Sequence, residues 1–322
     1  MEDINDMLMI LPISNSRKSR RGAALLAVIW LIAILGIACM AALRVVSFDM
    51  EIASHKIHGS RARQFAEMGI AVGCNPSIKR TDPLLKQLNG KTGEGFEARV
   101  MAEGARFNIN LLLLGNDTSF ISELFNQWGL EPNEAQALVA ALTDWVNPDT
   151  GGCSPNGAGK AQYEAMGCMN EPFNRPFYNI NEMRLVRGMD HLEALRPDWR
   201  EWFTVWSSGA LDLNEAPAEL IAAAAECSVA QAQIIPQTVC GPDGIRDTPD
   251  DVPFQSKTTA LALLGIDTKN RPDLAKRFTI GDTTARIESI GYAEGSKYKI
   301  TVVVRNRTGQ AALLERTEEI IP

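Results

Sequence analysis

The sequence predicts an α+β protein: a long N-terminal helix, an antiparallel sheet that packs on it, and a large all-helical domain inserted between the strands of that sheet. Three observations predict this fold. An uncharged apolar run at residues 23–43 continues without proline to residue 75. Residues 95–110 have the pattern of a hairpin, with a strand, a glycine turn at Gly104 and a second strand, and strand-like alternation returns from residue 278 onward. Between these strands, residues 111–277 have helical periodicity interrupted by Gly, Pro and Asn loops.

Composition and charge restrict the class of protein. The 322 residues carry a formal net charge of -7, and the mean hydropathy is -0.09. A mean hydropathy near zero excludes a protein with many membrane spans. An acidic chain also lacks the basic surface that binds nucleic-acid phosphates. We therefore expect a folded protein with no nucleic-acid partner.

The apolar run at residues 23–43 is long enough to cross a membrane, because a spanning helix needs about 20 apolar residues. Four basic residues precede it: Arg17, Lys18, Arg20 and Arg21. Since positive charge stays on the cytoplasmic side, we expect a single span with the N-terminus in the cytoplasm and the residues after Leu43 outside it. A cleaved secretory signal and a buried helix are the alternatives. A secretory signal fits less well because its apolar core has about 7–15 residues.

Gly22 lies between the basic cluster and the apolar run. A membrane-embedded peptidase at the cytoplasmic face needs a scissile bond at this boundary, and glycine offers it a backbone without a side chain. The order of basic cluster, glycine and apolar helix resembles the class III signal of type IV prepilins. The resemblance implies that prepilin peptidase cleaves after Gly22 and that the new terminal residue, Ala23, is N-methylated.

The apolar run continues as a helix beyond the membrane, since Val45, Phe48 and Ile52 keep helical spacing. One helix of about 50 residues would be about 75 Å long. A half-embedded helix that carries a globular domain is the pilin architecture. The predicted segments are a leader (1–22), the membrane part of the helix (23–43), its outer half (44–75), a first part of the sheet (76–110), the inserted helical domain (111–277) and a C-terminal β-meander (278–322).

Several motifs follow one another along the chain: RGAALLAVIWLIAILG, RQFAEMGIAVG, GARFNINLLL, LVAALTDWVNPD, YNINEMRLVRGMD and LDLNEAPAELI. Together they resemble general secretion pathway protein K, a family of large minor pseudopilins of type II secretion systems. The resemblance implies a subunit at the pseudopilus tip that initiates or caps the filament and aids protein export across the outer membrane. It implies an inner-membrane anchor, a periplasmic globular domain, and three kinds of partner: other minor pseudopilins, the major pseudopilin and prepilin peptidase. A minor pilin of a type IV pilus is the nearest alternative.

Ala27 occupies the fifth position of the expected mature chain, where most pilins carry a glutamate. In that family the glutamate pairs with the amino terminus of a neighbouring subunit. A carboxylate in hydrocarbon is retained only where a partner neutralises it. A subunit with no neighbour above it lacks that partner, so alanine is what a tip subunit should have. The alternative is that Ala27 is simply one more lipid-facing residue.

The stretch LDLNEAPAELI, in which Asn214 and Pro217 precede a helix, resembles the start of a helix-hairpin-helix module. Such modules bind DNA phosphates through backbone amides, so a membrane-anchored DNA-uptake protein is a further alternative. The stretch reaches Cys227 without a basic hairpin. A protein-packing surface is therefore the favoured interpretation.

Two acidic loops are candidate cation sites: Asp144, Asn147 and Asp149 in the first, and Asp243, Asp247, Asp250 and Asp251 in the second. Calcium takes about 6–8 oxygen ligands from carboxylates, amides and carbonyls. The first loop matches the DW-x-x-PD stretch of the protein K family, whose members carry bound calcium. Neither loop has the spacing of an EF-hand, and solvated loops with helix-capping aspartates explain them equally well. No cofactor is required, and calcium is the candidate ligand.

Cysteine spacing predicts two local disulfides, Cys153 with Cys168 and Cys227 with Cys240. Each closes a loop of a size that a disulfide stabilises by about 3 kcal/mol, and disulfides fit an oxidising compartment. Cys74 is left over. Zinc is the competing interpretation, but the sequence has no CxxC pair. It also has no Ser/His/Asp order, HExxH motif, phosphate loop or nucleophile elbow, so we expect no catalysis.

Overall fold

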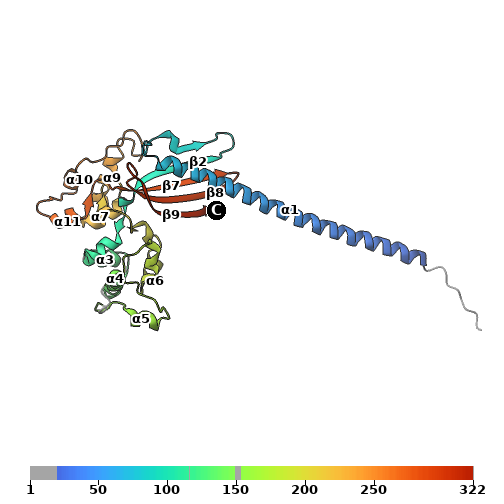
Figure 1. Cartoon of the computed structure of the whole chain (residues 1–322), viewed down its shortest axis with the longest axis horizontal. Coiled ribbons are helices and arrows are strands. Elements are labelled where there is room, and N and C mark those ends of the chain that lie inside the picture. The colour runs from blue at the N-terminus through green and yellow to red at the C-terminus, as the bar shows by residue number, and fades with distance from the viewer. Residues whose placement is uncertain (1–19, 116, 149–153, 322) are drawn as a thin grey trace, which may run out of the picture. The chain divides into compact units, whose positions relative to one another are not determined.

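A computed structural model describes residues 20–115, 117–148 and 154–321. The chain forms two compact units, Met1–Ile57 and His58–Pro322. The predicted fold class is confirmed, because the described residues form a long N-terminal helix, an antiparallel sheet and many short helices (Figure 1).

Helix α1 runs from Arg20 to Cys74, as the absence of proline predicts. From Ala23 onward it contains an 18-residue window with a mean hydropathy of 2.8, no part of which is buried within the described structure. Apolar side chains along this window are exposed; Leu31, for example, is 68% exposed. Water is an unfavourable environment for so much apolar surface, whereas lipid is a favourable one. The helix therefore fits a single-pass membrane anchor.

The main sheet has five antiparallel strands in the order β1-β2-β7-β8-β9. Their bounds are Lys86–Leu88 (β1), Gly95–Ala102 (β2), Thr284–Ala293 (β7), Ser296–Arg305 (β8) and Ala312–Ile321 (β9). Strands β2 and β7 pair along their length, so the segments on either side of the inserted helices meet in one sheet. Strands β7 and β8 are joined at Glu294 and Gly295, whose φ angles of 41° and 81° suit a two-residue hairpin turn. The predicted return of strands after residue 278 is confirmed.

The predicted hairpin at residues 95–110 is wrong in its second half. The chain leaves the sheet after β2 through a 3-10 helix, Glu103–Ala105, and the next strand, β3 (Phe107–Asn108), pairs in parallel with β4 (Phe203–Thr204). The physical reason is Asn108, whose side-chain oxygen accepts a hydrogen bond from the N–H of Leu111 at 3.3 Å. This N-cap starts helix α2, Ile109–Leu114, where a second sheet strand was expected.

The second unit contains the last turns of α1, which pack closely on one face of the sheet. A Cβ atom added at Gly291 would lie 1.9 Å from the carbonyl oxygen of Ala62 and 2.5 Å from the nitrogen of Ala66. A Cβ atom added at Gly69 would lie 2.1 Å from the Oγ of Ser289. Glycine therefore permits close approach on both sides: Gly291 of the sheet meets the helix backbone, and Gly69 of the helix meets a side chain of the sheet. The core between them contains Ala66, Ile70, Leu85, Phe96, Ala98, Val100, Ile287, Ile300, Val302 and Val304.

Arg307 holds the end of α1 against the sheet. It follows β8, and its guanidinium donates hydrogen bonds to the carbonyl oxygens of Gly73 at 2.6 Å, Asn75 at 2.8 Å and Ile78 at 2.6 Å. The last carbonyl groups of a helix have no partner within the helix, so a cation that binds them stabilises its end. The position of α1 on the sheet is fixed both by the glycine contacts and by this arginine.

The inserted residues fold as short helices around one core. The α-helices that follow α2 are α3 (Thr118–Gln127), α4 (Pro132–Val146), α5 (Lys160–Ala165), α6 (Met189–Leu195), α7 (Ala218–Ala225), α8 (Val229–Ala232), α9 (Ile234–Val239), α10 (Lys257–Leu263) and α11 (Pro272–Lys276). A two-stranded parallel sheet of β5 (Leu211–Asp212) and β6 (Phe278–Thr279) closes the insertion. Figure 1 shows α3 to α6 in one group and α7 to α11 in another. Fully buried Trp145, Tyr163 and Trp199 belong to their shared core.

Candidate functional site

The expected processing site lies at the amino end of α1. Gly22 and Ala23 fall within its first turn, and Ala27 lies one turn further on with an exposed side chain. These three residues therefore stand where the apolar helix begins. Cleavage after Gly22, methylation of Ala23 and the tip-subunit interpretation of Ala27 stay predictions.

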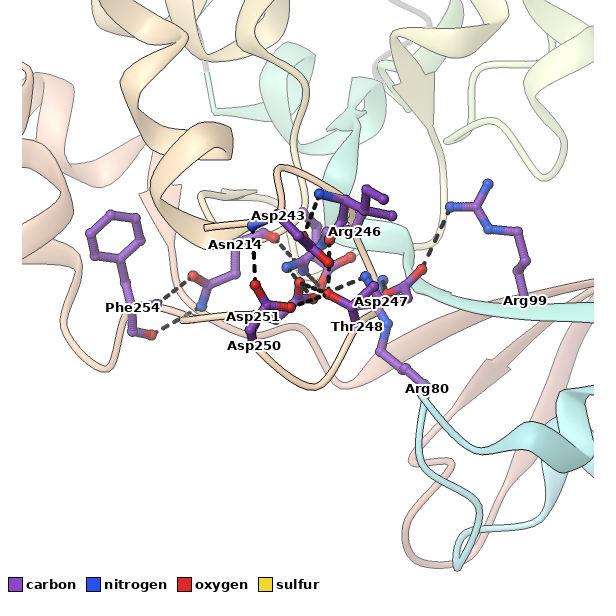
Figure 2. Close-up of polar contacts among 12 residues, drawn as sticks. Arg80, Arg99, Asn214, Asp243, Arg246, Asp247, Thr248, Asp250, Asp251 and Phe254 are labelled. Carbon is purple, nitrogen blue, oxygen red and sulfur yellow. Dashed lines mark hydrogen bonds and ion pairs between the residues drawn. The ribbon is translucent and has the colours of Figure 1, made fainter. Parts of the chain in front are cut away.

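The second acidic loop is organised by its own hydrogen bonds (Figure 2). Asp250 accepts the N–H of Asp243 at 3.2 Å and the hydroxyl of Thr248 at 2.6 Å. The hydrogen bond from Thr248 lowers the pKa of Asp250. Asp251 accepts the N–H of Asp247 at 3.0 Å, and Asp247 has a positive φ of 67°. These carboxylates fold the loop by binding its backbone amides.

Two arginines pair with the carboxylates of the loop: Arg80 from outside the loop and Arg246 within it. Arg80, which follows α1, places one nitrogen 3.0 Å from Asp247 and another against Glu215 (Figure 2). Arg246 lies 3.1 Å from Asp251 and 3.1 Å from Glu215. Glu215, only 10% exposed, thus lies between two guanidinium groups. The loop is therefore joined through ion pairs to the start of α7 and to the segment after α1.

In this structure the ion-pair partners of these carboxylates are arginines. Among the residues that the structure describes, no group of three or more His, Cys, Asp or Glu side chains is arranged to hold a metal. The sequence indicated the aspartates but not Arg80 and Arg246. Arg246 stands within the acidic run, which was the one signal that could have revealed it.

The first acidic loop also uses its aspartate structurally. The carboxylate of Asp144 is buried and accepts both the N–H of Ser154 at 2.9 Å and its hydroxyl at 2.6 Å. Asn174 donates to the carbonyl oxygens of Asp144 at 3.3 Å and Asn147 at 3.1 Å. Asp149, the third candidate ligand of this loop, lies outside the described residues.

Two asparagines of the sequence motifs form hydrogen bonds with the backbone of loop residues distant in sequence. Asn110 donates to the carbonyl oxygen of Phe177 at 2.9 Å and accepts its N–H at 2.8 Å. Asn214 makes the same two bonds with Phe254, at 3.0 Å and 2.8 Å (Figure 2). Each amide forms the two hydrogen bonds that a neighbouring strand would form with the same residue. It therefore satisfies the N–H and C=O groups of a loop residue that has no strand partner. In this structure both asparagines hold loop residues in place, and a packing role for LDLNEAPAELI stays a prediction.

Of the two predicted cysteine bridges, only that between Cys227 and Cys240 lies wholly within the described residues, and it is not found. Cys227 and Cys240 both carry free thiols, so the predicted bridge between them is absent from the structure. Cys227 follows α7 and Cys240 caps α9, so each belongs to a different helix end. Closeness in sequence did not bring these thiols together. Cys168 is also free, and its predicted partner Cys153 lies outside the described residues.

Burial of Asp212, in the LDLNEAP motif, should make the free energy of unfolding depend on pH. Its side chain is buried, and burial raises its pKa to about 6 against hydrogen bonds from the N–H groups of Gly281 and Asn214. A carboxyl whose folded pKa lies above its unfolded value of about 4 binds its proton more tightly in the folded state. Its contribution to stability, about 2–3 kcal/mol, is complete below pH 4 and lost as pH rises through 6.

We expect Asp212→Asn to flatten this part of the pH profile, because asparagine does not titrate. The measurement is urea unfolding of the full chain in detergent between pH 5 and pH 7.5, compared with wild type. Asp190→Asn, on the exposed surface of α6, is the control and should keep the wild-type profile. Identical profiles for wild type and Asp212→Asn would contradict the prediction.

Fold and site together define a class: a membrane-anchored protein with a pilin-like helix and sheet and a large helical insertion. Residues 105–198 match the family model of type II secretion system protein K. The structure is similar to a chain in the crystal structure of the GspK-GspI-GspJ complex from the type 2 secretion system of enterotoxigenic Escherichia coli. Identity is 14%, the TM-score is 0.59, and the match covers 85% of this chain and 99% of that chain. No curated protein matches.

The family match covers residues 105–198 and the similar structure shows a shared fold, and both agree with the resemblance to the protein K family that the sequence predicted. The family match lies at the start of the inserted helical domain.

Proposed function

We propose that this protein is the minor pseudopilin at the tip of a type II secretion pseudopilus, where it initiates or caps the filament and aids export across the outer membrane. The match of residues 105–198 to the protein K family carries the proposal. Two further observations support it. Ala27 stands where most pilins have a glutamate that pairs with a neighbouring subunit, so this helix lacks the carboxylate that such a neighbour would neutralise. The helical insertion adds bulk that obstructs the stacking of a further subunit.

The proposal includes maturation and topology. The leader is removed after Gly22 by prepilin peptidase, Ala23 becomes the methylated terminus, the helix is held in the inner membrane, and the second unit lies in the periplasm. The partners are two further minor pseudopilins, because the similar chain belongs to a crystal structure of a GspK-GspI-GspJ complex. The major pseudopilin is the partner below that complex. We propose no catalytic role.

Co-expression tests the partnership. The full chain, extracted in mild detergent with the two minor pseudopilins of the same secretion system, should elute as one complex in size-exclusion chromatography. Secretion should fail when the chain is deleted and return when it is restored. Normal secretion without the chain, together with loss of type IV pili, would identify a pilus subunit instead.

Calcium stays a proposal for the two acidic loops. If a calcium ion binds at the second loop, its charge must compete with Arg80 and Arg246 for the same carboxylates. We expect 2 mM calcium to raise the melting temperature of the full chain, since a ligand that binds only the folded state stabilises it. Asp247→Asn with Asp251→Asn should remove that rise if the second loop is the site. An unchanged melting temperature and no heat in calorimetric titration would contradict calcium binding.

A further inference from the structure

The inserted domain and the sheet have separate hydrophobic cores within the second unit. The described buried residues of the core that contains Trp145 all lie from Phe107 to Phe278. Those of the core between α1 and the sheet lie at residues 66–100 and 287–304, before and after the inserted domain. The two bodies are therefore not joined by one shared apolar core.

The chain crosses between these two bodies at one junction. It leaves β2 through the 3-10 helix Glu103–Ala105 and returns to β7 through residues 280–283. The two crossings lie against each other, because a Cβ atom added at Gly104 would lie 2.8 Å from Oδ2 of Asp282. Each crossing contains a glycine, and Gly281 has a φ of 82° with nothing within 4 Å of an added Cβ atom. Two short neighbouring connections with a glycine in each suit a hinge.

The sheet face next to the inserted domain is largely polar. Cross-strand register places Arg286 on β7, Val303 on β8 and Glu315 on β9 in one row. Their chain neighbours Ile287 and Val302 belong to the core beside α1, so this row lies on the opposite face of the sheet. Val303 is the one apolar residue of the row; it is 2% exposed and belongs to neither core. Polar interfaces between parts of one chain permit relative motion of those parts.

A first polar contact holds the inserted domain against the edge strand β9. The carboxylate of Glu315 accepts hydrogen bonds from Nδ2 of Asn179 at 2.7 Å and from Nε1 of Trp206 at 2.5 Å. Both donors belong to the inserted domain, and the acceptor belongs to the sheet. We call this contact the Glu315 latch.

A second polar contact lies at strand β2, which β7 and β8 separate from β9. Asp247 of the inserted domain lies 3.0 Å from a nitrogen of Arg80 and 3.6 Å from a nitrogen of Arg99 on β2 (Figure 2). We call this contact the Asp247 latch. Salt weakens ion pairs near the surface because it screens their charges. The inserted domain is thus held at two separate points by contacts that salt and charge removal can weaken.

We propose that the inserted domain is a hinged body, which turns about the junction at Gly104 and Gly281 and is held against the sheet by the Glu315 latch and the Asp247 latch. Such a turn leaves both cores intact, because no buried residue among those described is shared between them. A cavity of about 370 Å³ borders Gly281 and gives the junction space to move. The turn uncovers the polar sheet face around Arg286. This device goes beyond the proposed function, since it does not depend on the place of the chain in a filament.

Pulsed electron paramagnetic resonance of the full chain in detergent tests the proposal through the distance between two spin labels. The six native cysteines are replaced by alanine, and labels are attached to Lys297→Cys on β8 and Met169→Cys in the inserted domain, both exposed positions. We expect one dominant distance at low salt and a second distance population that grows at about 0.5 M salt. Glu315→Ala with Asp247→Asn should raise the second population at least fivefold at low salt. Asparagine is used at residue 247 because it tolerates the φ of 67° found there.

Two controls separate a turn of the domain from loss of its structure. Labels at Met169→Cys and at the exposed Lys269→Cys both lie within the inserted domain, so their distance should stay constant in every variant. Glu193→Gln removes ion pairs of 2.9 Å and 3.0 Å inside this domain and should change neither distance.

Three results would overturn the hinge. The first is one unchanged distance between residues 297 and 169 in all variants and at both salt concentrations. The second is a changed distance between residues 169 and 269, because the domain would then loosen instead of turning. The third is an effect of Glu193→Gln equal to that of the double variant, because loss of any carboxylate would then suffice.

Discussion

Gly291→Val should lower the free energy of unfolding of the full chain by about 3 kcal/mol or more. A Cβ atom at residue 291 would lie 1.9 Å from a carbonyl oxygen of α1, and a helix backbone has no side-chain freedom with which to relieve that contact. The helix would have to move away from the sheet, which would open the core around Ile287 and Ile300. Urea unfolding in detergent, followed by tryptophan fluorescence, measures the loss.

Gly59→Ala is the matched control for this prediction. Gly59 also lies in α1, but a Cβ atom added there meets nothing within 4 Å. Alanine is a better helix former than glycine, so this substitution should stabilise the chain by up to about 1 kcal/mol. If Gly291→Val and Gly59→Ala had the same effect, close packing of α1 on the sheet would be contradicted.

Trp145→Ala should destabilise the inserted domain by about 3–5 kcal/mol. Trp145 is 0% exposed, and its ring centroid lies 5.1 Å from Phe173, 5.5 Å from Tyr163 and 6.1 Å from Phe177. Removal of the indole leaves a cavity that three aromatic rings cannot close together. Its Nε1 has no hydrogen-bond partner among the described residues, so Trp145→Phe should cost clearly less than Trp145→Ala.

Met169→Ala provides the control, because this side chain also belongs to the inserted domain but is 69% exposed. Its removal should change the free energy of unfolding by less than about 0.5 kcal/mol. Unfolding of each variant is followed by tryptophan fluorescence and by far-ultraviolet circular dichroism. A loss below 1 kcal/mol for Trp145→Ala would show that this ring does not anchor the core.

Features of the fold that depend on local physics were predictable from the sequence. The apolar run at residues 23–43 and the absence of proline specify α1, and alternation with a Glu294–Gly295 turn specifies the last strands. Features that depend on long-range pairing were not. Strand β1 has three exposed residues without alternation, and β3 pairs with β4 across nearly a hundred residues of sequence. Asn108 turns the chain into a helix where residues 95–110 alone predict a hairpin.

The candidate sites divide in the same way. The acidic residues of the second loop were visible as a cluster, whereas their partner Arg80 is more than a hundred and sixty residues away in sequence. Cys227 and Cys240 show the opposite case. They are close in sequence, but they lie at the ends of two different helices and do not form a disulfide. A pattern of charges or thiols indicates which groups are present, but the tertiary fold decides which of them meet.

The amino terminus of the membrane-extracted protein tests the central claim most directly. Edman degradation or mass spectrometry of the protein from cells with an intact prepilin peptidase should find N-methylated Ala23 as the first residue. Cells that lack the peptidase should retain the leader up to Gly22. An amino terminus near residue 43, as a signal peptidase that cleaves after the apolar run would leave, would contradict the identification as a membrane-anchored pseudopilin.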